Sequence, residues 1–330
     1  MLIPFSPQIH LSIHPSIPSK KMVNQTYLTD FVLLGFSDNR KLQILHFVVF
    51  LFIYLVALIG NLLIMQTVIQ HSHLHSPMYF FLANLSFVDI GYISTTVPKT
   101  MANSFQDDKL IPYSGCITQV FLVSTFAGAE LALLTVMAYD RYVAICSPLQ
   151  YSLIMSWNAC FKMAAASFLC STINGMVQAV STFSLHFCSS HVVEQFFCDT
   201  PQLLKISCSD TQPIILYMFA FVIIVGFPCL LLVSISYIYI FCTVFKIQSA
   251  QGRHKAFSTC TPHLTIFSVF ITTSIFSYLR PKSLSSLSLD LLTAVLYTVL
   301  PPLMNPIIYS LRNREIQVAL SKMVKKKIML

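Results

Sequence analysis

The amino-acid sequence predicts an all-α membrane protein, a bundle of seven transmembrane helices followed by a short amphipathic eighth helix. Two observations support this fold class. Of the 330 residues, 55% are hydrophobic and only 10% are charged, whereas a soluble domain of this length needs far more charged surface. The chain also contains seven apolar segments of about 20 residues or more, the length that a helix needs to cross the hydrocarbon core of a bilayer.

Each of these segments is continuously apolar, without the alternation of polar and apolar residues that a barrel strand shows, and this favours helices. No internal repeat relates the two halves of the chain, so the inverted repeats of many transporters are not apparent. The predicted spans are residues 42–69, 78–97, 117–139, 161–183, 213–245, 256–279 and 289–311.

The spans divide the chain into a predicted extracellular segment, the transmembrane bundle and a cytoplasmic tail, at residues 1–41, 42–311 and 312–330. Asn24-Gln25-Thr26 is a glycosylation acceptor, which is useful only in the lumen or outside the cell. It therefore predicts an extracellular N-terminus. Residues 1–21 match a secretory signal peptide poorly. Met22 is followed closely by the glycosylation site, which favours a start at Met22 over the alternative at Met1; the upstream piece is then an extension without a fold.

The predicted tail combines apolar and basic residues. The net charge of +8 does not indicate nucleic-acid binding, because no basic stripe alternates with polar faces. Apolar residues among the bases instead predict an amphipathic helix on the membrane, with its basic side chains toward anionic lipids of the cytoplasmic leaflet. These basic residues are Arg312, Arg314, Lys322 and residues 325–327.

An acidic, a basic and a phenolic residue stand side by side at the end of the third predicted span, as Asp140, Arg141 and Tyr142 of the string MAYDRYVAIC. A charge at the membrane boundary is costly unless it is paired or reaches water, so residues of this kind are candidates for function. The alternative is that Arg141 extends its side chain to the water line and has no further role.

Two carboxylates are predicted deep in the membrane, Asp89 in the second span and Glu130 in the third. Glu130 precedes Arg141 by eleven residues, which is three helical turns toward the membrane centre and near the expected depth of Asp89. Two unpaired anions there are very costly, so either at least one is protonated or a cation lies between them. The pair does not indicate an enzyme, because neither a nucleophile with a base nor an HExxH metal-binding spacing accompanies it.

Four of the ten cysteines fall on the predicted extracellular side. Cys116 precedes the third span, whereas Cys188, Cys198 and Cys208 lie in the long loop between the fourth and fifth spans. The oxidising environment favours disulfides, and four cysteines allow three pairings. The other six fall in spans or on the cytosolic side, where we expect inert thiols.

Several longer strings lie in and beside the spans. PMYFFLANLS occupies residues 77–86, KAFSTC residues 255–260 and PLMNPIIYSLRN residues 302–313. Together with MAYDRYVAIC, they make the chain from Met22 to about Lys322 resemble the odorant (olfactory) receptors, a family of rhodopsin-like G-protein-coupled receptors. The DRY and NPxxY elements alone indicate the wider superfamily, whereas PMYFFL, MAYDRYVAIC and KAFSTC are specific to odorant receptors.

This resemblance implies a receptor that binds small volatile, mostly apolar ligands in a transmembrane pocket and activates a stimulatory-type heterotrimeric G protein to raise cyclic AMP. It implies a plasma membrane location, in the cilia of olfactory sensory neurons, and no required cofactor. Arg141 would accept the C-terminal helix of the G protein, and Asp140 would hold Arg141 in the resting state. The residues implied in coupling and activation are Asp140, Arg141, Tyr142, Tyr237, Lys255, Asn305, Pro306 and Tyr309.

The resemblance also implies a ligand pocket, for whose residues ordinary helix packing is an equal alternative. The usual Phe-Tyr-Gly of the sixth span reads Phe270-Ile271-Thr272 here, so the hydrogen bond of the tyrosine is lost and an apolar contact at Ile271 is expected. The residues do not separate a volatile ligand from another small metabolite. The implied pocket residues are Val123, Ser124, Ala127, Gly128, Phe221, Val222, Val225, Ile271, Ser274, Ile275, Tyr278 and Thr298.

For the two membrane carboxylates, the resemblance suggests a sodium ion held by Asp89 and Glu130, with Asn305 and Asn61 nearby. A proton-sharing structural network without metal is the alternative. The two interpretations differ in whether sodium in the medium changes the potency of an agonist.

Among the three pairings of the extracellular cysteines, the resemblance implies Cys116 with Cys198, which leaves Cys188 with Cys208. In the family, the cysteine of this loop stands in a His/Phe-Phe-Cys-Asp string. Gln195 stands here in place of the usual histidine, a departure expected to alter local contacts of the loop rather than the bridge.

Overall fold

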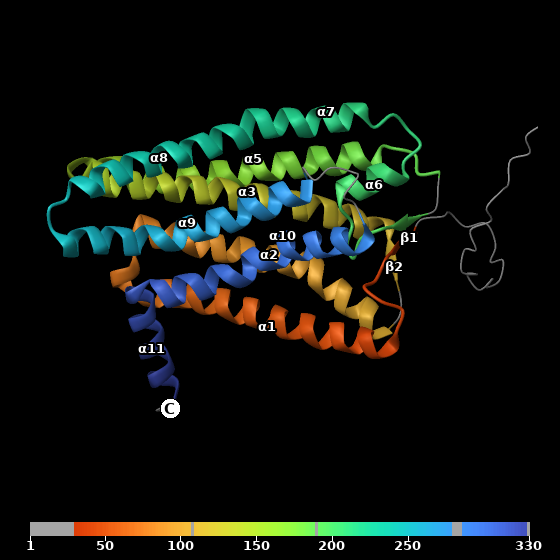
Figure 1. The fold of residues 1–330 in the computed structure, drawn as a ribbon, viewed down its shortest axis with the longest axis horizontal. Helices are drawn as coiled ribbons and strands as arrows, with labels where there is room; N and C mark the ends of the chain where they lie inside the picture. Colours follow the sequence, from red (N-terminus) through yellow and green to blue (C-terminus); the bar gives the residue numbers. More distant parts are fainter. Residues whose placement is uncertain (1–29, 107–108, 189–190, 279–285, 329–330) are drawn as a thin grey trace, which may run out of the picture.

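The computed structural model describes residues 30–106, 109–188, 191–278 and 286–328. Within these residues, seven helices are long and apolar enough to cross a membrane, which confirms the predicted fold class. Figure 1 shows the long helices lying side by side along the longest axis of the molecule, with a small sheet at one end. Helix α11 leaves the bundle at the opposite end (Figure 1).

The membrane-crossing helices extend beyond the predicted spans, because a helix continues past the hydrocarbon core wherever its backbone hydrogen bonds are satisfied. The fifth is composed of three consecutive pieces. In chain order they are α1 (Arg40–Gln70), α2 (Pro77–Gln106), α3 (Tyr113–Cys146), α5 (Trp157–Phe183), then α7 (Gln212–Phe221), η3 (Val222–Gly226) and α8 (Phe227–Lys246), followed by α9 (Ala250–Tyr278) and α10 (Leu287–Arg312).

Shorter elements lie at the two ends of the bundle. At the end of the bundle that the sequence predicts to be extracellular are β1 (Asp30–Leu33), β2 (Leu110–Pro112), β3 (Val192–Val193) and α6 (Thr200–Ile206). At the end that it predicts to be cytoplasmic are η1 (Ser72–Leu74), η2 (Pro148–Gln150), α4 (Tyr151–Ile154) and α11 (Arg314–Ile328).

Polar residues mark where several helices begin. The Asn39 side chain accepts a hydrogen bond from the backbone of Lys41 at the start of α1. Asn313 does the same for the first turn of α11, where its Oδ1 accepts from the backbone of Glu315 and Ile316 at 3.0 and 3.2 Å. These side chains satisfy amide groups that have no partner inside the helix, so the sequence itself fixes where α1 and α11 start.

The small sheet at the extracellular end is absent from the sequence analysis, which predicted no strand. Its order is β2-β1-β3, with β1 antiparallel to β2 and parallel to β3. Phe31 and Leu33 of β1 are buried beneath it. Strands of two to four residues carry too short a pattern to be recognised from the sequence, and they form because three distant segments meet at this end.

The fifth helix contains a π-helical turn at Val222–Gly226. Pro228 follows two residues after its end, at the second position of α8. Proline has no backbone N–H, so the regular i to i−4 ladder is interrupted there, and a wider turn absorbs the mismatch. The kink expected from proline in a span therefore takes the form of a π turn in this helix.

Helix α3 lies at the centre and packs against α2, α5 and α8. Glycines allow the closest approaches. A Cβ on Gly175 of α5 would lie 2.2 Å from the Thr125 side chain and 2.7 Å from the Phe121 carbonyl of α3. One on Gly91 of α2 would lie 2.3 Å from the Phe126 ring. Small residues let membrane helices pack backbone to backbone, and these two glycines set the spacing around α3.

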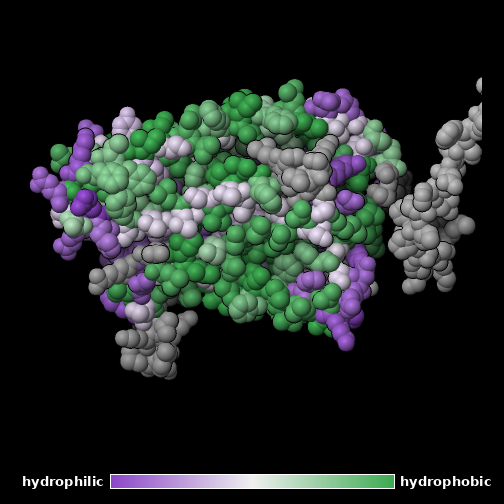
Figure 2. All heavy atoms as spheres, in the orientation of Figure 1, coloured by the Kyte–Doolittle hydropathy of each residue, from purple (hydrophilic) through white to green (hydrophobic). Residues whose placement is uncertain are grey.

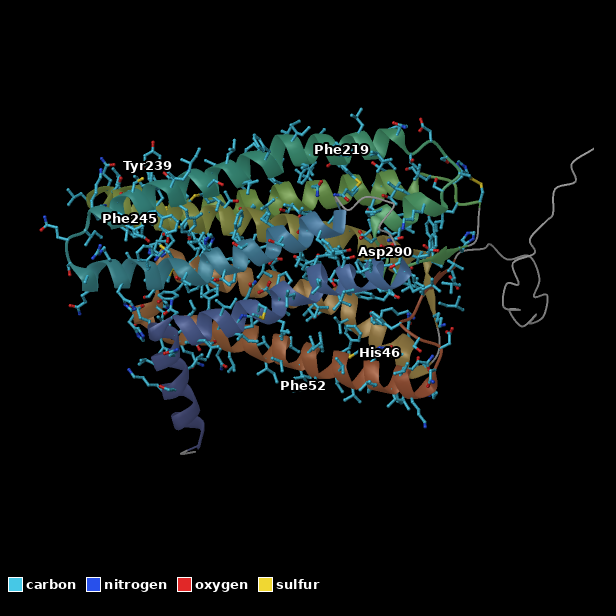
Figure 3. The ribbon with its side chains drawn as sticks, in the orientation of Figure 1. His46, Phe52, Phe219, Tyr239, Phe245 and Asp290 are labelled. Atoms are coloured by element: carbon cyan, nitrogen blue, oxygen red, sulfur yellow. A yellow bond between two sulfur atoms is a disulfide. The ribbon has the colours of Figure 1, made fainter. Side chains whose placement is uncertain are left out.

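Large apolar side chains cover the outside of the bundle (Figure 2). Phe52 of α1, Phe219 of α7 and Phe245 of α8 point outward (Figure 3) and are each more than half exposed. Such a surface suits a lipid surrounding. The polar side chains Asn61, Asp89 and Glu130 are instead fully buried between helices, so the polarity of the bundle is concentrated inside it.

Candidate functional site

The ion pair at the cytoplasmic end of α3 is buried. Asp140 is inaccessible to solvent, and 14% of the Arg141 side chain is exposed. One carboxylate oxygen of Asp140 accepts from Arg141, whose Nε lies at 3.0 Å, and the other accepts from the Tyr151 hydroxyl at 2.7 Å. Tyr151 belongs to α4, so the loop after α3 folds back onto the pair. Arg141 is thus held by its neighbour rather than extended into water.

The Tyr151 hydroxyl, which donates to Asp140, stays protonated. Its burial, followed by the nearby Asp140 carboxylate, raises the pKa of the Tyr151 phenol above its ordinary value near 10. The phenol therefore keeps its proton at physiological pH. The phenol is therefore available to donate to Asp140 throughout that range.

Two apolar side chains of the same loop are strongly exposed. Leu149 of η2 is 97% accessible and Leu153 of α4 is 80% accessible. They lie outside the membrane-crossing helices, so the hydrocarbon core does not account for their exposure, and exposed apolar groups of this kind mark interaction surfaces. Isolated leucines in a loop carry no signal in the sequence, so this exposed pair was not predicted.

A buried histidine that the sequence analysis missed connects three helices. His263 of α9 accepts at Nδ1 from the Tyr237 hydroxyl of α8 at 2.8 Å, and its Nε2 lies 2.8 Å from the Leu134 carbonyl of α3. Because a carbonyl only accepts, Nε2 carries the proton, which leaves Nδ1 as the acceptor. The Tyr237 ring also stacks on the imidazole at 5.7 Å. A lone histidine in an apolar run gives no sequence signal of such partners.

In the middle of the bundle, Asp89 and Asn305 come together from α2 and α10. The Asn305 Nδ2 group donates to both carboxylate oxygens of Asp89, at 3.0 and 2.8 Å. Asn61 of α1 donates to the Pro302 carbonyl of α10 at 2.9 Å. Pro306 also lies at this level, where its ring would be 2.9 Å from a Cβ on Gly60. These contacts join α1, α2 and α10.

Glu130 lies close enough to Asp89 for their charges to interact. Within the described part of the chain, neither of its carboxylate oxygens has a hydrogen-bond partner, and the same holds for Oδ1 of Asn305, Oδ1 of Asn61 and the Tyr309 hydroxyl. Carbonyl and carboxylate oxygens are the ligands that hard cations prefer. The donor set therefore fits the sodium ion that the resemblance implies.

The residues suggested as a ligand pocket do not all face the same space. Val123 and Ala127 pack into one cluster with the aromatic rings of Tyr92, Phe197 and Tyr297. This cluster lies between α2, α3, α10 and the second extracellular loop. Among the described residues, this cluster is where Val123 and Ala127 of the suggested pocket face the inside of the helical bundle.

Two other third-span residues of the suggested pocket face α5. Ser124 donates to the Gln178 side chain at 3.2 Å, and a Cβ on Gly128 would lie 3.1 Å from Ser171. The Ser124 contact belongs to a polar network that the sequence analysis missed. In this network Asn174 Oδ1 accepts from Tyr217 at 3.0 Å and from Gln178 at 3.4 Å.

Three suggested pocket residues are exposed on the outside of the bundle. Val222 and Ile275 are 59% and 50% exposed, and Val225 is 37% exposed. Thr298 is fully buried and donates to the Ala294 carbonyl within its own helix, at 2.7 Å. The remaining described members are partly buried, namely Phe221, Ile271 and Ser274.

The structure joins Cys116 to Cys198 and Cys188 to Cys208, the pairing that the resemblance implied. The first bridge ties the start of α3 to the second extracellular loop. Gln119 of α3 strengthens this link, because its side chain accepts from the Cys198 backbone at 3.0 Å and donates to the Thr95 carbonyl of α2 at 3.0 Å.

The same loop is also fixed to α10. The Tyr297 hydroxyl donates to Asp199 at 2.5 Å, and Lys205 of α6 forms an ion pair with Asp290 at 3.5 Å. Phe197 is fully buried next to the Tyr297 ring, at 6.1 Å. The second extracellular loop is thereby held on α3 and on α10 at once.

Some suggested residues lie outside the described part of the chain. Asn24 is one of them, and the side chains of Lys255 and Tyr278 are not described. Tyr142 is described and partly buried, with its ring 5.9 Å from that of Tyr239 on α8.

Seven membrane-crossing helices, a buried Asp140–Arg141 pair at the cytoplasmic end of the third and Asn305–Pro306 in the seventh define a G-protein-coupled receptor. A family model described as olfactory receptor matches residues 50–327. The chain belongs to the olfactory receptor family and is an odorant-sensing, multi-pass membrane receptor.

Several curated relatives share nearly half of their residues with this chain. Human olfactory receptor 14A16 is 47% identical over 307 residues, which cover 93% of this chain and 99% of the relative. Human olfactory receptor 14J1 is 48% identical, covering 92% and 95%, and mouse olfactory receptor 5AP2 is 46% identical, covering 91% and 95%. These relatives are receptors and not enzymes.

Proposed function

We propose that this receptor binds small, mostly apolar volatile molecules inside the helical bundle and activates a stimulatory-type heterotrimeric G protein, which raises cyclic AMP. The surface around Arg141 supports the proposed activation of a G protein. The Arg141 guanidinium is held there by Asp140, which also accepts from Tyr151, and the exposed Leu149 and Leu153 belong to the loop that follows. An amphipathic helix of a partner would find both an ionic and an apolar contact at this surface.

The hydrogen bonds of His263 and the ion pair of Arg141 have to change on activation. Outward movement of α9 separates His263 from Leu134 and from Tyr237, so both hydrogen bonds of the imidazole are lost or exchanged. Arg141 then turns from Asp140 toward the G protein. An agonist drives this change only to the extent that it binds the active arrangement more tightly than the resting one.

The ligand half of the proposal rests on the interior around Val123 and Ala127. Aromatic and aliphatic side chains enclose this region, which suits an apolar molecule. The network from Ser124 to Gln178 lies on the α5 side and supplies hydroxyl and amide groups for one polar group of the ligand. Ile271 of α9 packs against the main core and supplies an apolar contact from that helix.

We also propose that sodium binds between Asp89 and Glu130 in the resting state. The unpaired oxygens of Glu130 and Asn305 support a cation there. A monovalent cation would relieve the repulsion between two buried carboxylates without adding a large excess of charge. No other cofactor is proposed.

The proposed location is the plasma membrane of olfactory sensory cilia, with the N-terminus outside and Asn24 glycosylated. Helix α11 would lie on the cytoplasmic leaflet. Ile316 and Ala319 of α11 are buried against the bundle, and Tyr79 of α2 donates to Glu315 at 2.7 Å, so the start of this helix is attached to the membrane domain.

A two-step experiment tests the function. Cells that express the full chain and a cyclic-AMP reporter are screened with a panel of volatile compounds, and an active compound is then tested in cells that lack the stimulatory-type G proteins. The signal should disappear in those cells and return when a stimulatory-type α subunit is re-expressed. A signal that persists without that subunit, or returns only with an inhibitory-type subunit, contradicts the proposed coupling.

A further inference from the structure

The fifth and sixth membrane-crossing helices are in close contact in their cytoplasmic halves. Tyr237 of α8 donates to His263 of α9 at 2.8 Å. Nearer the loop that joins the two helices, the Phe257 ring of α9 lies 5.9 Å from Phe241 and 6.1 Å from Phe245 of α8. Among the described residues, α9 packs against α3, α8 and α10, but not against α7 or η3 to a comparable extent.

Val225 of η3 and Ile275 of α9 lie at the same depth in the bundle. Val225 precedes Tyr237 by twelve residues, and Ile275 follows His263 by twelve. Because the two helices run antiparallel from the contact between Tyr237 and His263, both positions lie about 18 Å nearer the extracellular end. Val225 is 37% exposed and Ile275 is 50% exposed, so the two helices do not cover each other at this depth.

Helix η3 is uncovered around nearly its whole circumference. Its first four residues, Val222, Ile223, Ile224 and Val225, are 59%, 64%, 71% and 37% exposed. One helical turn takes about four residues, so four successive side chains point in nearly every direction. A neighbouring helix at this level would bury at least one of them. Among the described residues, η3 instead packs mainly against α7 and α8, the pieces of its own helix.

The central helix α3 is partly accessible near the same depth. Its Leu134 carbonyl bonds to His263, so residues about ten positions earlier in α3 approach the level of Val225. Four residues there share one helix face, at the spacing i, i+3, i+4 and i+7, and none of them is fully buried. They are Ser124, Ala127, Gly128 and Leu131. One face of the central helix is thus not covered by its neighbours.

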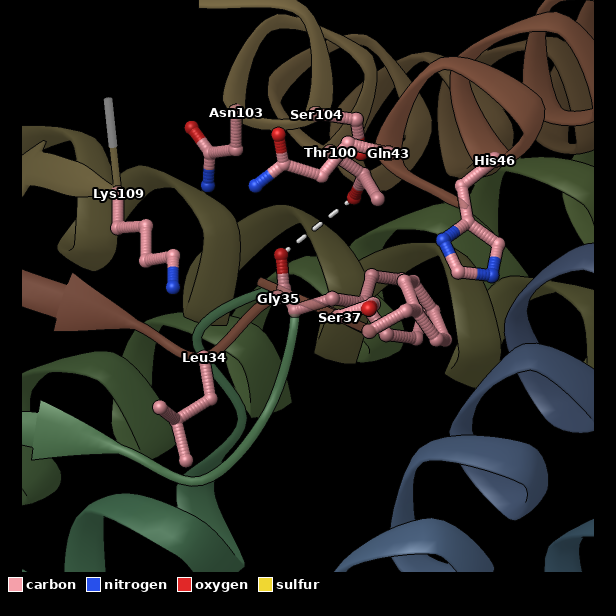
Figure 4. A pocket seen from close by; sticks show the side chains of 11 residues that line it. Leu34, Gly35, Ser37, Gln43, His46, Thr100, Asn103, Ser104 and Lys109 are labelled. Atoms are coloured by element: carbon pink, nitrogen blue, oxygen red, sulfur yellow. Dashed lines mark hydrogen bonds between the residues drawn. The ribbon is translucent and has the colours of Figure 1, made fainter. Parts of the chain in front are cut away.

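At the extracellular end, the second extracellular loop closes over the same region. Val123 of α3 is 4% exposed and packs in one cluster with Phe197 of this loop, which is fully buried. The disulfide to Cys116 holds the loop on α3, and Thr100 of α2 donates to the Phe196 carbonyl at 3.4 Å, the dashed line in Figure 4. The hollow drawn in Figure 4 encloses about 10 Å³, room for about one water molecule.

We propose that apolar volatile ligands enter the receptor from the bilayer, through a lateral opening between η3 and the extracellular end of α9. Apolar molecules leave water for hydrocarbon, so the bilayer presents them to this opening at high local concentration. Val222, Val225 and Ile275 stand at its outer side, and Ser124 and Ala127 at its inner end. The identity of the ligand rests on the proposed function, whereas the opening itself does not depend on coupling to a G protein.

The lateral opening is tested on the purified full chain in lipid nanodiscs that contain a photoreactive phosphatidylcholine. This lipid carries a phenyl diazirine at the end of one acyl chain, an apolar group the size of a small volatile molecule that reaches the protein only from the bilayer. After photolysis, mass spectrometry of peptides should find the label on Phe52, which is 68% exposed, and also on Ala127 of α3. Ala129, which is fully buried in the same helix, should stay unlabelled.

Filling the opening should remove the label from α3 alone. In Ile275→Trp, labelling of Ala127 should fall several-fold while labelling of Phe52 stays unchanged. Ile235→Trp, at a 47% exposed position in the cytoplasmic half of the fifth helix, is the matched control and should change neither. Val225→Trp fills the opening from the other side and keeps the test decisive if Ile275→Trp fails to fold, which thermal unfolding checks. Absence of label on α3 of the wild type, or unchanged labelling in the folded tryptophan variants, overturns the proposal.

A kinetic arm connects the opening to signalling and rests on the proposed function. In cells with the cyclic-AMP reporter, a compound active in the volatile panel should act on Ile275→Trp more slowly and wash out more slowly by the same factor, because a narrower entrance slows entry and exit alike. A residue that only contacts the ligand changes mainly the exit rate, so a change in washout alone would overturn the entry role of Ile275. If no compound activates the receptor, the proposed function fails while the labelling result stands.

Discussion

The two ends of the helical bundle are held together by different kinds of contact. At the extracellular end, the Cys116–Cys198 disulfide, a three-stranded sheet and buried aromatic rings join the loops to α3 and α10, and the Cys188–Cys208 disulfide closes the second loop on itself. At the cytoplasmic end, the described contacts between helices are packing and hydrogen bonds, among them those of Asp140 and His263. Covalent bonds persist through a conformational change, whereas hydrogen bonds exchange partners at a cost of about 1 kcal/mol each.

This difference indicates which end is fixed and which end moves. A receptor must transmit the presence of a ligand near one end to a partner at the other. A rigid extracellular end keeps the ligand site in shape, and a cytoplasmic end held by exchangeable contacts permits two arrangements of nearly equal energy. Four predictions test this comparison, in order of decreasing expected effect.

Loss of the disulfide at α3 should have the largest effect. The double variant Cys116→Ser/Cys198→Ser should lose nearly all receptor from the cell surface. Its bridge closes a separation of 82 residues and the other bridge one of 20, which on a chain-entropy model are worth about 4.5 and about 3 kcal/mol. Cys188→Ser/Cys208→Ser, the matched control, should retain more. Antibody staining of intact cells measures both, and equal surface levels would contradict the ranking.

At the cytoplasmic end, Arg141→Ala should abolish agonist-driven cyclic-AMP signalling while surface delivery persists. The guanidinium pairs with Asp140 near the proposed G-protein contact, and its loss leaves the fixed end untouched. Arg253→Ala, which removes an exposed charge on α9, is the control and should signal normally. Normal signalling by an Arg141→Ala receptor present in normal amount on the surface would refute the assigned role.

His263→Ala should raise basal signalling several-fold. The imidazole makes one hydrogen bond to α8 and one to α3, and the loss of even one of them, about 1 kcal/mol from the resting state, shifts a two-state equilibrium about fivefold. His254→Ala, at an exposed position of the same helix, should leave basal signalling unchanged. Cyclic AMP without ligand, normalised to surface receptor, is the measurement. A basal signal at or below that of the wild type would show that the contact does not stabilise the resting state.

The smallest effect is expected inside the bundle. A cation that prefers the resting state lowers agonist affinity by linkage, so replacing sodium with a bulky organic cation should increase agonist potency of the wild type. Glu130→Gln should weaken this sodium dependence more than it changes the maximal response. If agonist potency at the wild type does not depend on sodium, the proposed sodium site is wrong. The same holds if the potency depends on sodium as strongly in the variant as in the wild type. Either result favours the proton-sharing network between Asp89 and Glu130.

The sequence by itself determined the number of membrane-crossing helices and their approximate ends. It also identified the Asp140–Arg141 pair and the two membrane carboxylates. These features are local: a continuous apolar run long enough for the bilayer is readable from the run alone, and a charge inside such a run stands out without knowledge of its neighbours. The cysteine pairing needed more, since four cysteines alone leave three choices.

Only the tertiary structure decided which faces of the helices meet. In a soluble helix the apolar stripe identifies the buried face, but a membrane helix is apolar toward lipid and toward its neighbours alike. The outward position of Val222 and Ile275 was therefore unreadable from the sequence. The partners of His263 lie on two other helices, α8 and α3, and only the rotation and depth of each helix in the bundle bring them together.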